Sequence, residues 1–242
     1  MDGQRDLFGE AGQVGWDVRR SARARRLAIR VFPEGRVEII VPVHASAGVV
    51  QAFVARHRNW IERKLAERRS HAPTDEMFPP RLLQLAAFEE SWPIEFVPTL
   101  REPRLLSFDG SVLRVAESAT PANLRRALLR WLLEHARNGF AERLETLAKD
   151  SGLRHASLQV RRQRTRWGSC SRRGAISLNV CGVFQRPAVL RYLMLHELVH
   201  LRHMNHSDHY WRAVEELCPE WRALDRELSQ GWRQVPRWVF DA

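Results

Sequence analysis

Hydrophobic and polar side chains alternate along residues 14–43, with the two-residue period of a strand that has one buried face. Two such runs flank Pro33-Glu34-Gly35, and Pro42 ends the second run, so the pattern predicts a β-hairpin. The hydrophobic positions expected on the buried face are Leu27, Ile29, Val31, Val37, Ile39 and Val41.

The period changes at Ser46, which is suited to cap a helix running to about Arg69. Its expected buried stripe is Val49, Val50, Phe53, Trp60, Ile61 and Leu65. Three prolines then mark residues 70–80 as a loop, and short hydrophobic runs predict four strands between residues 81 and 116.

A long amphipathic helix is predicted from Thr120-Pro121 to about Lys149, ended by Ser151-Gly152. Three short strands are expected within residues 157–180, followed by a helix that Pro187 begins. Two further helices are expected at 207–217 and 219–228. This order of elements predicts an α+β fold rather than a doubly wound parallel sheet.

The same order suggests how the chain is divided. We expect a disordered tail at 1–13, a β-rich region with one helix at 14–118, and a second domain at 119–242 that combines a small sheet with several helices. No internal repeat or low-complexity segment is present.

Composition excludes several classes of protein. Of 242 residues, 44% are hydrophobic and 28% charged, which is typical of a globular chain and not of a disordered one. No apolar run reaches the roughly 20 residues that span a bilayer, and no signal peptide is recognisable, so we expect a cytoplasmic protein without a membrane partner. Three cysteines without a C-x-x-C pair indicate neither a disulfide framework nor a thiolate zinc site.

The formal net charge is +11, which favours an anionic partner such as nucleic acid or a nucleotide. Of the 39 basic residues only Lys64 and Lys149 are lysines. A coding bias toward arginine explains the charge equally well, so charge alone does not define a partner.

Five of the ten histidines lie between residues 196 and 209. His196 and His200 belong to an H-E-x-x-H pattern, and residues four apart on a helix project side by side, so both imidazoles can bind one Zn²⁺. Glu197 between them is placed to act as general base on a water that the metal activates. The neighbouring residues on this helix are apolar, so burying these polar side chains without a binding partner would cost free energy.

A catalytic zinc usually takes three protein ligands. His206 follows Asn205, where the chain can turn back, and gives the spacing H-E-x-x-H-x5-H. His203 would sit poorly as a third ligand from one straight helix. His206 is therefore the expected third ligand, with a carboxylate from Glu215 or Glu216 as the competitor.

The turn that follows offers further candidates. His209 and Tyr210 are candidate catalytic residues that would stabilise an oxyanion at the open metal position, and packing around the site is the alternative for both. Asp208 is a candidate for orienting a ligand imidazole.

Residues 161–173 contain six arginines and precede the histidine helix. Strands in this region are expected to wall the cleft and to pair with an extended peptide. Cys170 is more simply a small packed residue than a nucleophile, since no base accompanies it. The candidate substrate-binding residues are Arg164, Arg166, Trp167 and Ser169.

Taken together, these motifs resemble the YgjP-like metallopeptidase family, a relative of the SprT-like and WLM zinc peptidases. The resemblance extends from about residue 16 to 230, which suggests one continuous family unit. It implies one zinc per chain held by His196, His200 and His206, with Glu197 as the catalytic residue. The domain at 119–242, with its small sheet and H-E-x-x-H helix, is then expected to be a zincin-like catalytic domain. The matching segments are R-x-R-W-G-S-C-S (164–171), I-S-L-N (176–179), Pro187, Tyr192, H-E-L-V-H (196–200), N-H-S (205–207), Tyr210-Trp211, the S-x-R-A-R-R-L-A-I-R-V hairpin and the W-I-E-R-K-L helix.

Three functions follow as hypotheses. The first is a zinc metallopeptidase that acts on a peptide or protein substrate. The second is a nucleoside triphosphate pyrophosphohydrolase that uses the same metal, with Arg164, Arg166 and Arg202 binding phosphates. The third is a nucleic-acid-associated module with a structural zinc. The sequence does not indicate an oligomeric state.

Overall fold

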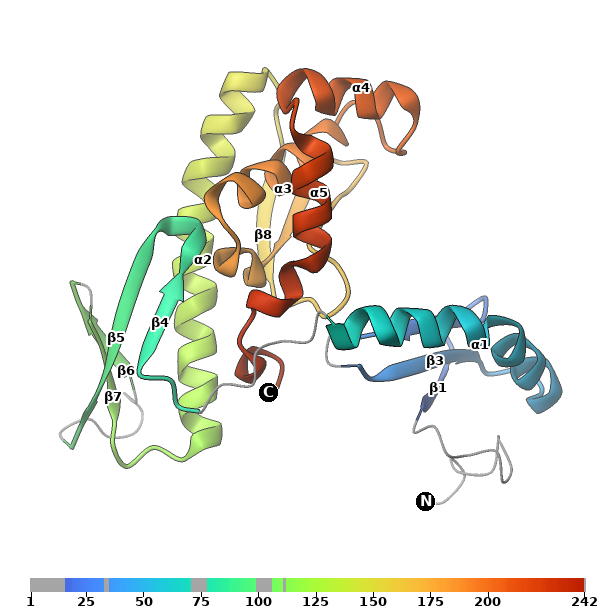
Figure 1. Cartoon of the computed structure of the whole chain (residues 1–242), viewed down its shortest axis with the longest axis horizontal. Coiled ribbons are helices and arrows are strands. Elements are labelled where there is room, and N and C mark those ends of the chain that lie inside the picture. The colour runs from blue at the N-terminus through green and yellow to red at the C-terminus, as the bar shows by residue number, and fades with distance from the viewer. Residues whose placement is uncertain (1–15, 33–34, 71–77, 99–105, 111, 242) are drawn as a thin grey trace. The chain divides into compact units, whose positions relative to one another are not determined.

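The computed structural model describes residues 16–32, 35–70, 78–98, 106–110 and 112–241, so the expected tail at 1–13 lies outside the described residues. The chain divides into two compact units, residues 1–72 and 73–242 (Figure 1). Mixed sheets and five α-helices among the described residues confirm the α+β class. None of the described helices is long and apolar enough to cross a membrane.

The first unit is a three-stranded sheet covered by one helix. The predicted hairpin is confirmed, because β2 (Ala28–Val31) pairs antiparallel with β3 (Val37–Pro42). A preceding strand, β1 (Asp17–Ser21), pairs parallel with β3 on its other edge, which gives the order β1-β3-β2. Helix α1 (Ala47–Ser70) packs on one face of this sheet.

The buried stripe of α1 differs in part from the sequence prediction. Val50, Val54 and Ile61 are buried against the sheet, whereas Val49 is 56% and Trp60 37% exposed. Val49 lies about 100° around the helix from Val50, and a sheet of three strands is too narrow to cover both directions. The prediction that Val49 and Trp60 are buried is wrong.

The second unit begins with a four-stranded sheet of order β4-β5-β7-β6. Its outer pairs are antiparallel and its central pair, β5 and β7, is parallel. Helix α2 (Pro121–Ser151) runs beside this sheet, capped by Thr120 and ended by Gly152 in the left-handed conformation (φ +66°) (Figure 1). The strands are β4 (Leu82–Leu85), β5 (Glu90–Val97), β6 (Leu106–Asp109) and β7 (Val112–Ala116), with a 3-10 turn η2 (Ala86–Phe88) after β4.

The division between units therefore falls between Ala72 and Pro73, not between residues 118 and 119. The reason is a shared core. Trp92 of β5 packs edge-on against Trp131 of α2, with ring centroids 5.0 Å apart. The buried faces of β4, β5 and β7 belong to the same hydrophobic cluster as α2 and the histidine helix. Residues 82–116 consequently fold with the metal-site half of the chain.

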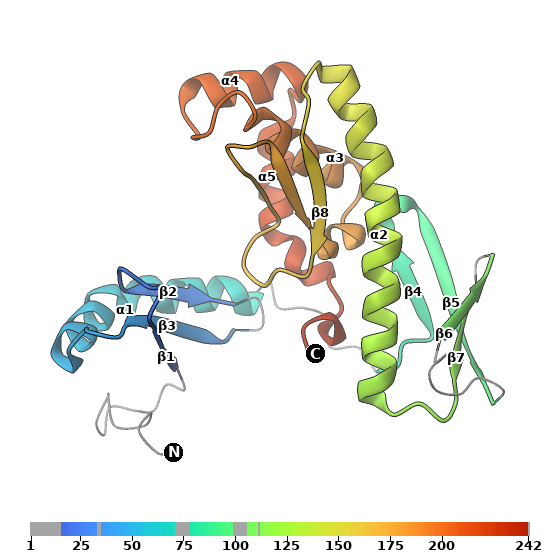
Figure 2. The ribbon, with the colours of Figure 1, turned by 180° about the vertical axis from the view of Figure 1, so that it is seen from behind.

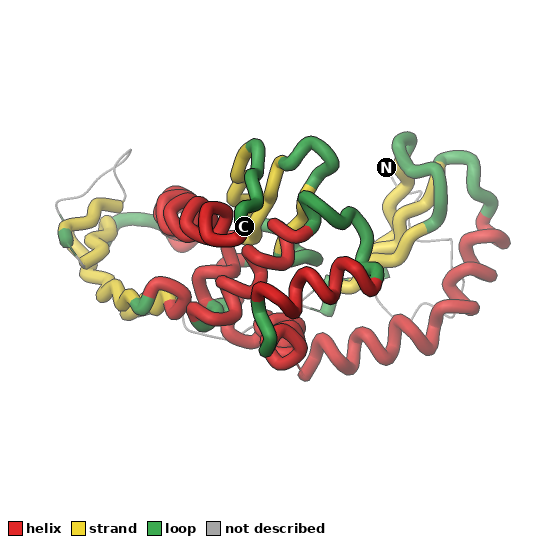
Figure 3. Tube along the Cα trace, turned by 90° about the horizontal axis from the view of Figure 1, so that it is seen from above, coloured by secondary structure: helices red, strands yellow, loops and turns green. Residues whose placement is uncertain are grey.

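A second small sheet of order β8-β10-β9 lies against α2, as the view from behind shows (Figure 2). Figure 3 shows the strands of the second unit in two separate groups. The elements of this region are β8 (Ser157–Arg161), β9 (Gly168–Cys170), β10 (Ala175–Asn179), α3 (Pro187–Val199), α4 (Asp208–Leu217), α5 (Trp221–Gln230) and the 3-10 turns η3 (Val180–Phe184), η4 (Gly231–Gln234) and η5 (Arg237–Val239).

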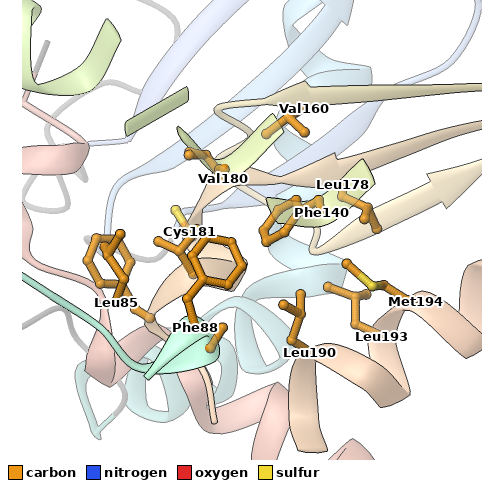
Figure 4. Packing of buried hydrophobic residues seen from close by; sticks show 14 of the residues in the cluster. Leu85, Phe88, Phe140, Val160, Leu178, Val180, Cys181, Leu190, Leu193 and Met194 are labelled. Carbon is orange, nitrogen blue, oxygen red and sulfur yellow. The ribbon is translucent and has the colours of Figure 1, made fainter. Parts of the chain in front are cut away.

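Phe140 of α2 lies where these elements meet. Its ring packs edge-on against Phe88, with centroids 5.8 Å apart, and lies between Leu178 of β10 and Leu190 of α3 (Figure 4). The side chain is fully buried. Helix α3 is thus fixed by the same aromatic residue that joins α2 to the second sheet.

We expect Phe140→Ala to lower the free energy of unfolding of the second unit by about 3–5 kcal/mol, because it removes a buried ring and leaves a cavity. Urea unfolding followed by tryptophan fluorescence measures this change, since seven of the nine tryptophans lie in residues 73–242. Arg137→Ala, an exposed change on the same helix, should alter stability by less than about 0.5 kcal/mol. Equal losses in both variants would contradict the packing described.

Candidate metal centre

The histidine helix α3 is held in the core along most of its length. Pro187 occupies its first turn, where a missing N–H costs nothing. Most of its following side chains are buried, Leu193 and Met194 among them (Figure 4). The helix ends at Val199, six residues before the stop expected at Asn205. His200 and the residues after it can therefore turn back toward the helix.

Three imidazoles meet at this helix end. His196, His200 and His206 each offer a ligand nitrogen, and these nitrogens all lie within 4.8 Å of one another. The Nε2 atoms of His196 and His206 are 3.2 Å apart. They form the one cluster of metal-ligating side chains found among the described residues. His206, which its spacing in the sequence made the expected third ligand, lies in this cluster.

The distances fit a metal ion of zinc's size. Two nitrogens bound at about 2.0–2.1 Å to a tetrahedral ion lie about 3.3 Å apart. The separation of 3.2 Å between the Nε2 atoms of His196 and His206 is close to that value. Two unprotonated ring nitrogens facing each other repel unless a cation or a proton lies between them, so the pair is suited to a shared metal.

Hydrogen bonds on the far side of two rings set their tautomers. The Nδ1–H of His200 donates to the carbonyl oxygen of His203 (2.9 Å), which leaves Nε2 of His200 with a free lone pair. Tyr192 donates its hydroxyl to Asp225 (2.8 Å), so its oxygen is left to accept from Nδ1 of His196 at 3.4 Å. Both rings thus present Nε2 to the cluster.

The local electrostatics favour the neutral form of His196 and His206, which ligation requires. Burial, followed by the neighbouring His200 and His206, lowers the pKa of His196 to about 3. Burial and His200 also lower the pKa of His206, although the Asp225 carboxylate acts in the opposite direction.

Glu197 lies beside the three imidazoles and is 4% exposed. Burial raises the pKa of its carboxyl group to about 8, while the Arg166 guanidinium opposes that shift. Its Oε2 atom has no hydrogen-bond partner among the described residues. A buried carboxylate oxygen without a partner is costly, so this atom is suited to a ligand or water at the metal position.

Strand β9 passes directly over Glu197. A Cβ atom added to Gly168 would lie 2.4 Å from Oε1 and 2.9 Å from Cδ of the Glu197 side chain. Only glycine allows the strand to come this close. The segment Trp167-Gly168-Ser169-Cys170 predicts a tight backbone feature, but it does not indicate that Gly168 contacts Glu197.

β9 is an edge strand, because β10 pairs with it on one side and the sheet order ends there. The N–H of Ser171 donates to Ala175 (2.9 Å), so the antiparallel alternation turns the amides of Ser169 inward to β10. The N–H and C=O groups of Gly168 and Cys170 then point to the free edge. This edge offers backbone partners to an extended chain beside Glu197.

Tyr210 and His209 occupy different surroundings. The Tyr210 hydroxyl donates to the carbonyl oxygen of His196 (3.1 Å), and its buried ring stacks on His200 at 4.6 Å between centroids. His209 is exposed, with its ring 6.4 Å from that of His203 and its Nδ1 3.4 Å from Arg212. Tyr210 thus packs against His200 and binds the backbone of His196, and a catalytic role for Tyr210 or His209 stays a prediction.

The acidic alternatives lie outside the cluster. Glu215 accepts from Arg222 (2.6 Å) on an exposed surface, and Glu216 is also exposed. Asp208 is exposed at the start of α4. The orienting role expected of Asp208 is instead met by Tyr192 with Asp225 and by the His203 carbonyl.

The four candidate substrate-binding residues have different surroundings in the structure. Arg164 donates to the carbonyl oxygen of Phe240 (2.6 Å), and Trp167 stacks on Trp232 at 4.1 Å, so both contact the C-terminal segment. Arg166 is exposed and close enough to influence Glu197. Ser169 alternates with Gly168 along β9, so its side chain points away from Glu197.

Cys170 lies on the Glu197 side of the strand. Burial, followed by the Glu197 carboxylate, raises the pKa of its thiol to about 11. A thiol with a raised pKa is a poor nucleophile at neutral pH, in agreement with the packed role preferred from the sequence.

Asn179 holds the loop that delivers Arg166 and Gly168. The buried side chain donates through Nδ2 to the carbonyl oxygens of Gln163 and Arg166, each at 2.7 Å, and accepts from the N–H of Cys181 (3.1 Å). Asn179 is the last residue of the I-S-L-N segment, and the sequence does not predict a role for it. Its position at the end of β10 does not indicate that both Nδ2 and Oδ1 of its side chain form hydrogen bonds.

Comparison with known proteins agrees with the metal site. The model of a YgjP-like metallopeptidase domain matches residues 25–231, and metallopeptidases are metal-dependent hydrolases. The chain belongs to the YgjP-like family. No curated protein matches its sequence. Among solved structures it is similar to the metallopeptidase zymogen abylysin of Pyrococcus abyssi, at 24% identity and a TM-score of 0.35, over 39% of this chain and 97% of that chain.

We expect the purified chain to bind one zinc ion, and His196→Ala, His200→Ala or His206→Ala each to lower the zinc affinity at least about 100-fold. His209→Ala is the matched control, because its exposed ring lies outside the cluster. Competition with a fluorescent zinc chelator gives the affinities. Retained affinity in the His206 variant, with a loss in Glu215→Ala, would instead favour a carboxylate ligand.

Proposed function

We propose that this protein is a zinc-dependent peptidase of the H-E-x-x-H type, with His196, His200 and His206 as ligands. The observation that carries the proposal is the buried Glu197 oxygen without a partner beside three converging imidazoles. A structural zinc is disfavoured, because structural sites usually have four ligands and are rich in cysteine. Membership of the YgjP-like family also supports a metal-dependent hydrolase.

When bound, zinc supplies Lewis-acid chemistry: it polarises a carbonyl and makes water acidic enough to lose a proton near neutral pH. Glu197 takes that proton as water attacks, and its burial beside the metal limits competing contacts with solvent. Returning the proton from Glu197 to the departing amine completes the hydrolysis of a peptide bond.

The free edge of β9 is the proposed substrate-binding strand. Gly168 and Cys170 offer N–H and C=O groups there, and an extended peptide pairs with such an edge through its own backbone. Pairing through the backbone selects for extended chains and leaves side-chain preference to neighbouring residues. The exposed Arg166 next to this strand is the candidate for such a contact.

A peptide substrate is favoured over a nucleoside triphosphate. Of the arginines expected to bind phosphates, Arg164 donates to the Phe240 carbonyl, so it supports the loop before β9. Nucleotides nevertheless belong in the substrate screen, because release of pyrophosphate without peptide cleavage would replace the proposal with that second hydrolase activity.

We expect Glu197→Gln to keep stoichiometric zinc and to lower kcat for a peptide substrate at least about 100-fold, because glutamine preserves the shape but cannot accept a proton. Substrates would come from a quenched-fluorescence peptide library, and zinc content from metal analysis. Turnover at the wild-type rate in this variant would exclude Glu197 as general base.

Gly168→Ala tests the contact between β9 and Glu197 separately from the metal. Its new methyl group would overlap the Glu197 carboxyl group, so the carboxylate or the strand must shift, and we expect kcat to fall about 10- to 100-fold with zinc affinity unchanged. Gly48→Ala is the control, because no atom lies within 4 Å of its added Cβ. A fall in zinc affinity equal to the loss of kcat would show that the contact maintains the metal site instead.

A further inference from the structure

The positive charge of the chain is concentrated in the first unit. Residues 1–72 contain fourteen basic and eight acidic residues, a net charge of +6 in 72 residues, and the part of this unit from residue 16 onward has a net charge of +8. Residues 73–242 contain 25 basic and 20 acidic residues, a net charge of +5 in 170 residues. A coding bias toward arginine would act on both units alike, so it does not explain the difference.

The three acidic residues of this unit whose side chains the structure describes each have a basic partner. Asp17 accepts from Arg36 (3.1 Å). Glu38 pairs with two arginines of neighbouring strands, and Glu62 with one on α1. These pairs leave a second set of arginines with no acidic partner among the described residues: Arg20, Arg23, Arg25, Arg26, Arg56 and Arg63.

Four of these arginines lie together at one end of the sheet. Ser21 at the end of β1 is level with Pro42 at the end of β3, and β2 starts at the same end, because Ala28 pairs with Ile40. The segment 22–27 therefore lies beside the connection from β3 to α1, and Arg20 donates to the carbonyl oxygen of Val43 (3.0 Å). We call Arg20, Arg23, Arg25 and Arg26 the basic end.

The first turn of α1 begins at this end and has no acidic side chain, so its free N–H groups add positive potential. From there one stripe of the helix carries Val49, Arg56, Trp60 and Arg63 within about 60° of arc. All four side chains are exposed. The stripe is about 21 Å long, which is enough for several nucleotides.

We propose that the first unit binds single-stranded nucleic acid, with phosphates on the basic end, Arg56 and Arg63 and a base stacked on Trp60. Guanidinium groups spaced along a surface match a chain of phosphates better than one small anion. An exposed indole between arginines is a stacking platform that needs an unpaired base. A membrane surface fits less well, because α1 turns most of its apolar side chains toward the sheet.

The test is fluorescence anisotropy of the full-length protein with a labelled oligothymidylate of about 20 nucleotides, across a range of salt concentrations. Replacing Arg23, Arg25 and Arg26 by alanine should weaken binding at least about 10-fold and reduce the slope of log K against log salt by about 2. The matched control removes the same charge from exposed positions of α2, as Arg126→Ala, Arg130→Ala and Arg137→Ala, and should leave the slope unchanged. Equal losses in both triple variants would overturn the proposal, since binding would then follow net charge alone.

Trp60 distinguishes single strands from other anionic partners. Trp60→Ala should weaken binding about 5- to 100-fold with no change in the salt slope, and Trp60→Phe should restore most of the loss. A duplex of the same length should bind more weakly than the single strand. Tighter binding of the duplex, or binding of anionic phosphatidylserine vesicles without binding of the oligonucleotide, would overturn the proposal.

Discussion

The close approach of β9 to the last turn of α3 is the constraint on which the metal centre depends. Gly168 allows the strand to lie against the Glu197 carboxyl group, and no larger residue fits there without a shift. The same contact excludes solvent from Glu197 and brings the free edge of β9 beside the imidazoles. The burial of Glu197 thus follows from one contact between a strand and a helix, and the proposed catalytic and substrate-binding roles both depend on that contact.

Buried side chains stabilise the contact between β9 and α3 from both sides. Phe140 of α2 fixes α3 and β10 in one hydrophobic cluster, and the Asn179 side chain fixes the loop before β9 through hydrogen bonds to Gln163 and Arg166. Burying such polar atoms is favourable only because each has a partner. The metal position can then be rigid before any metal binds, which lowers the entropic cost of ligation.

The two units differ in chemistry as well as in fold. The second unit holds the metal centre in a core shared by two sheets, whereas the first has a small core and a large excess of arginine. The two proposals therefore concern different units: binding of a polyanion is assigned to the first and hydrolysis to the second. The family model covers both, since it matches residues 25–231.

Much of this follows from local sequence alone. The hairpin, the long helices and the pairing of His196 with His200 depend on spacing along the chain, which period and capping residues determine. Other features of the site depend on tertiary contacts, which spacing along the chain does not determine. The early end of α3 at Val199, the approach of Gly168 to Glu197 and the Tyr192–Asp225 contact each join residues through packing of distant segments. The boundary at residue 72 and the exposure of Trp60 likewise depend on which surfaces meet, because burial is a property of the folded chain and not of a residue.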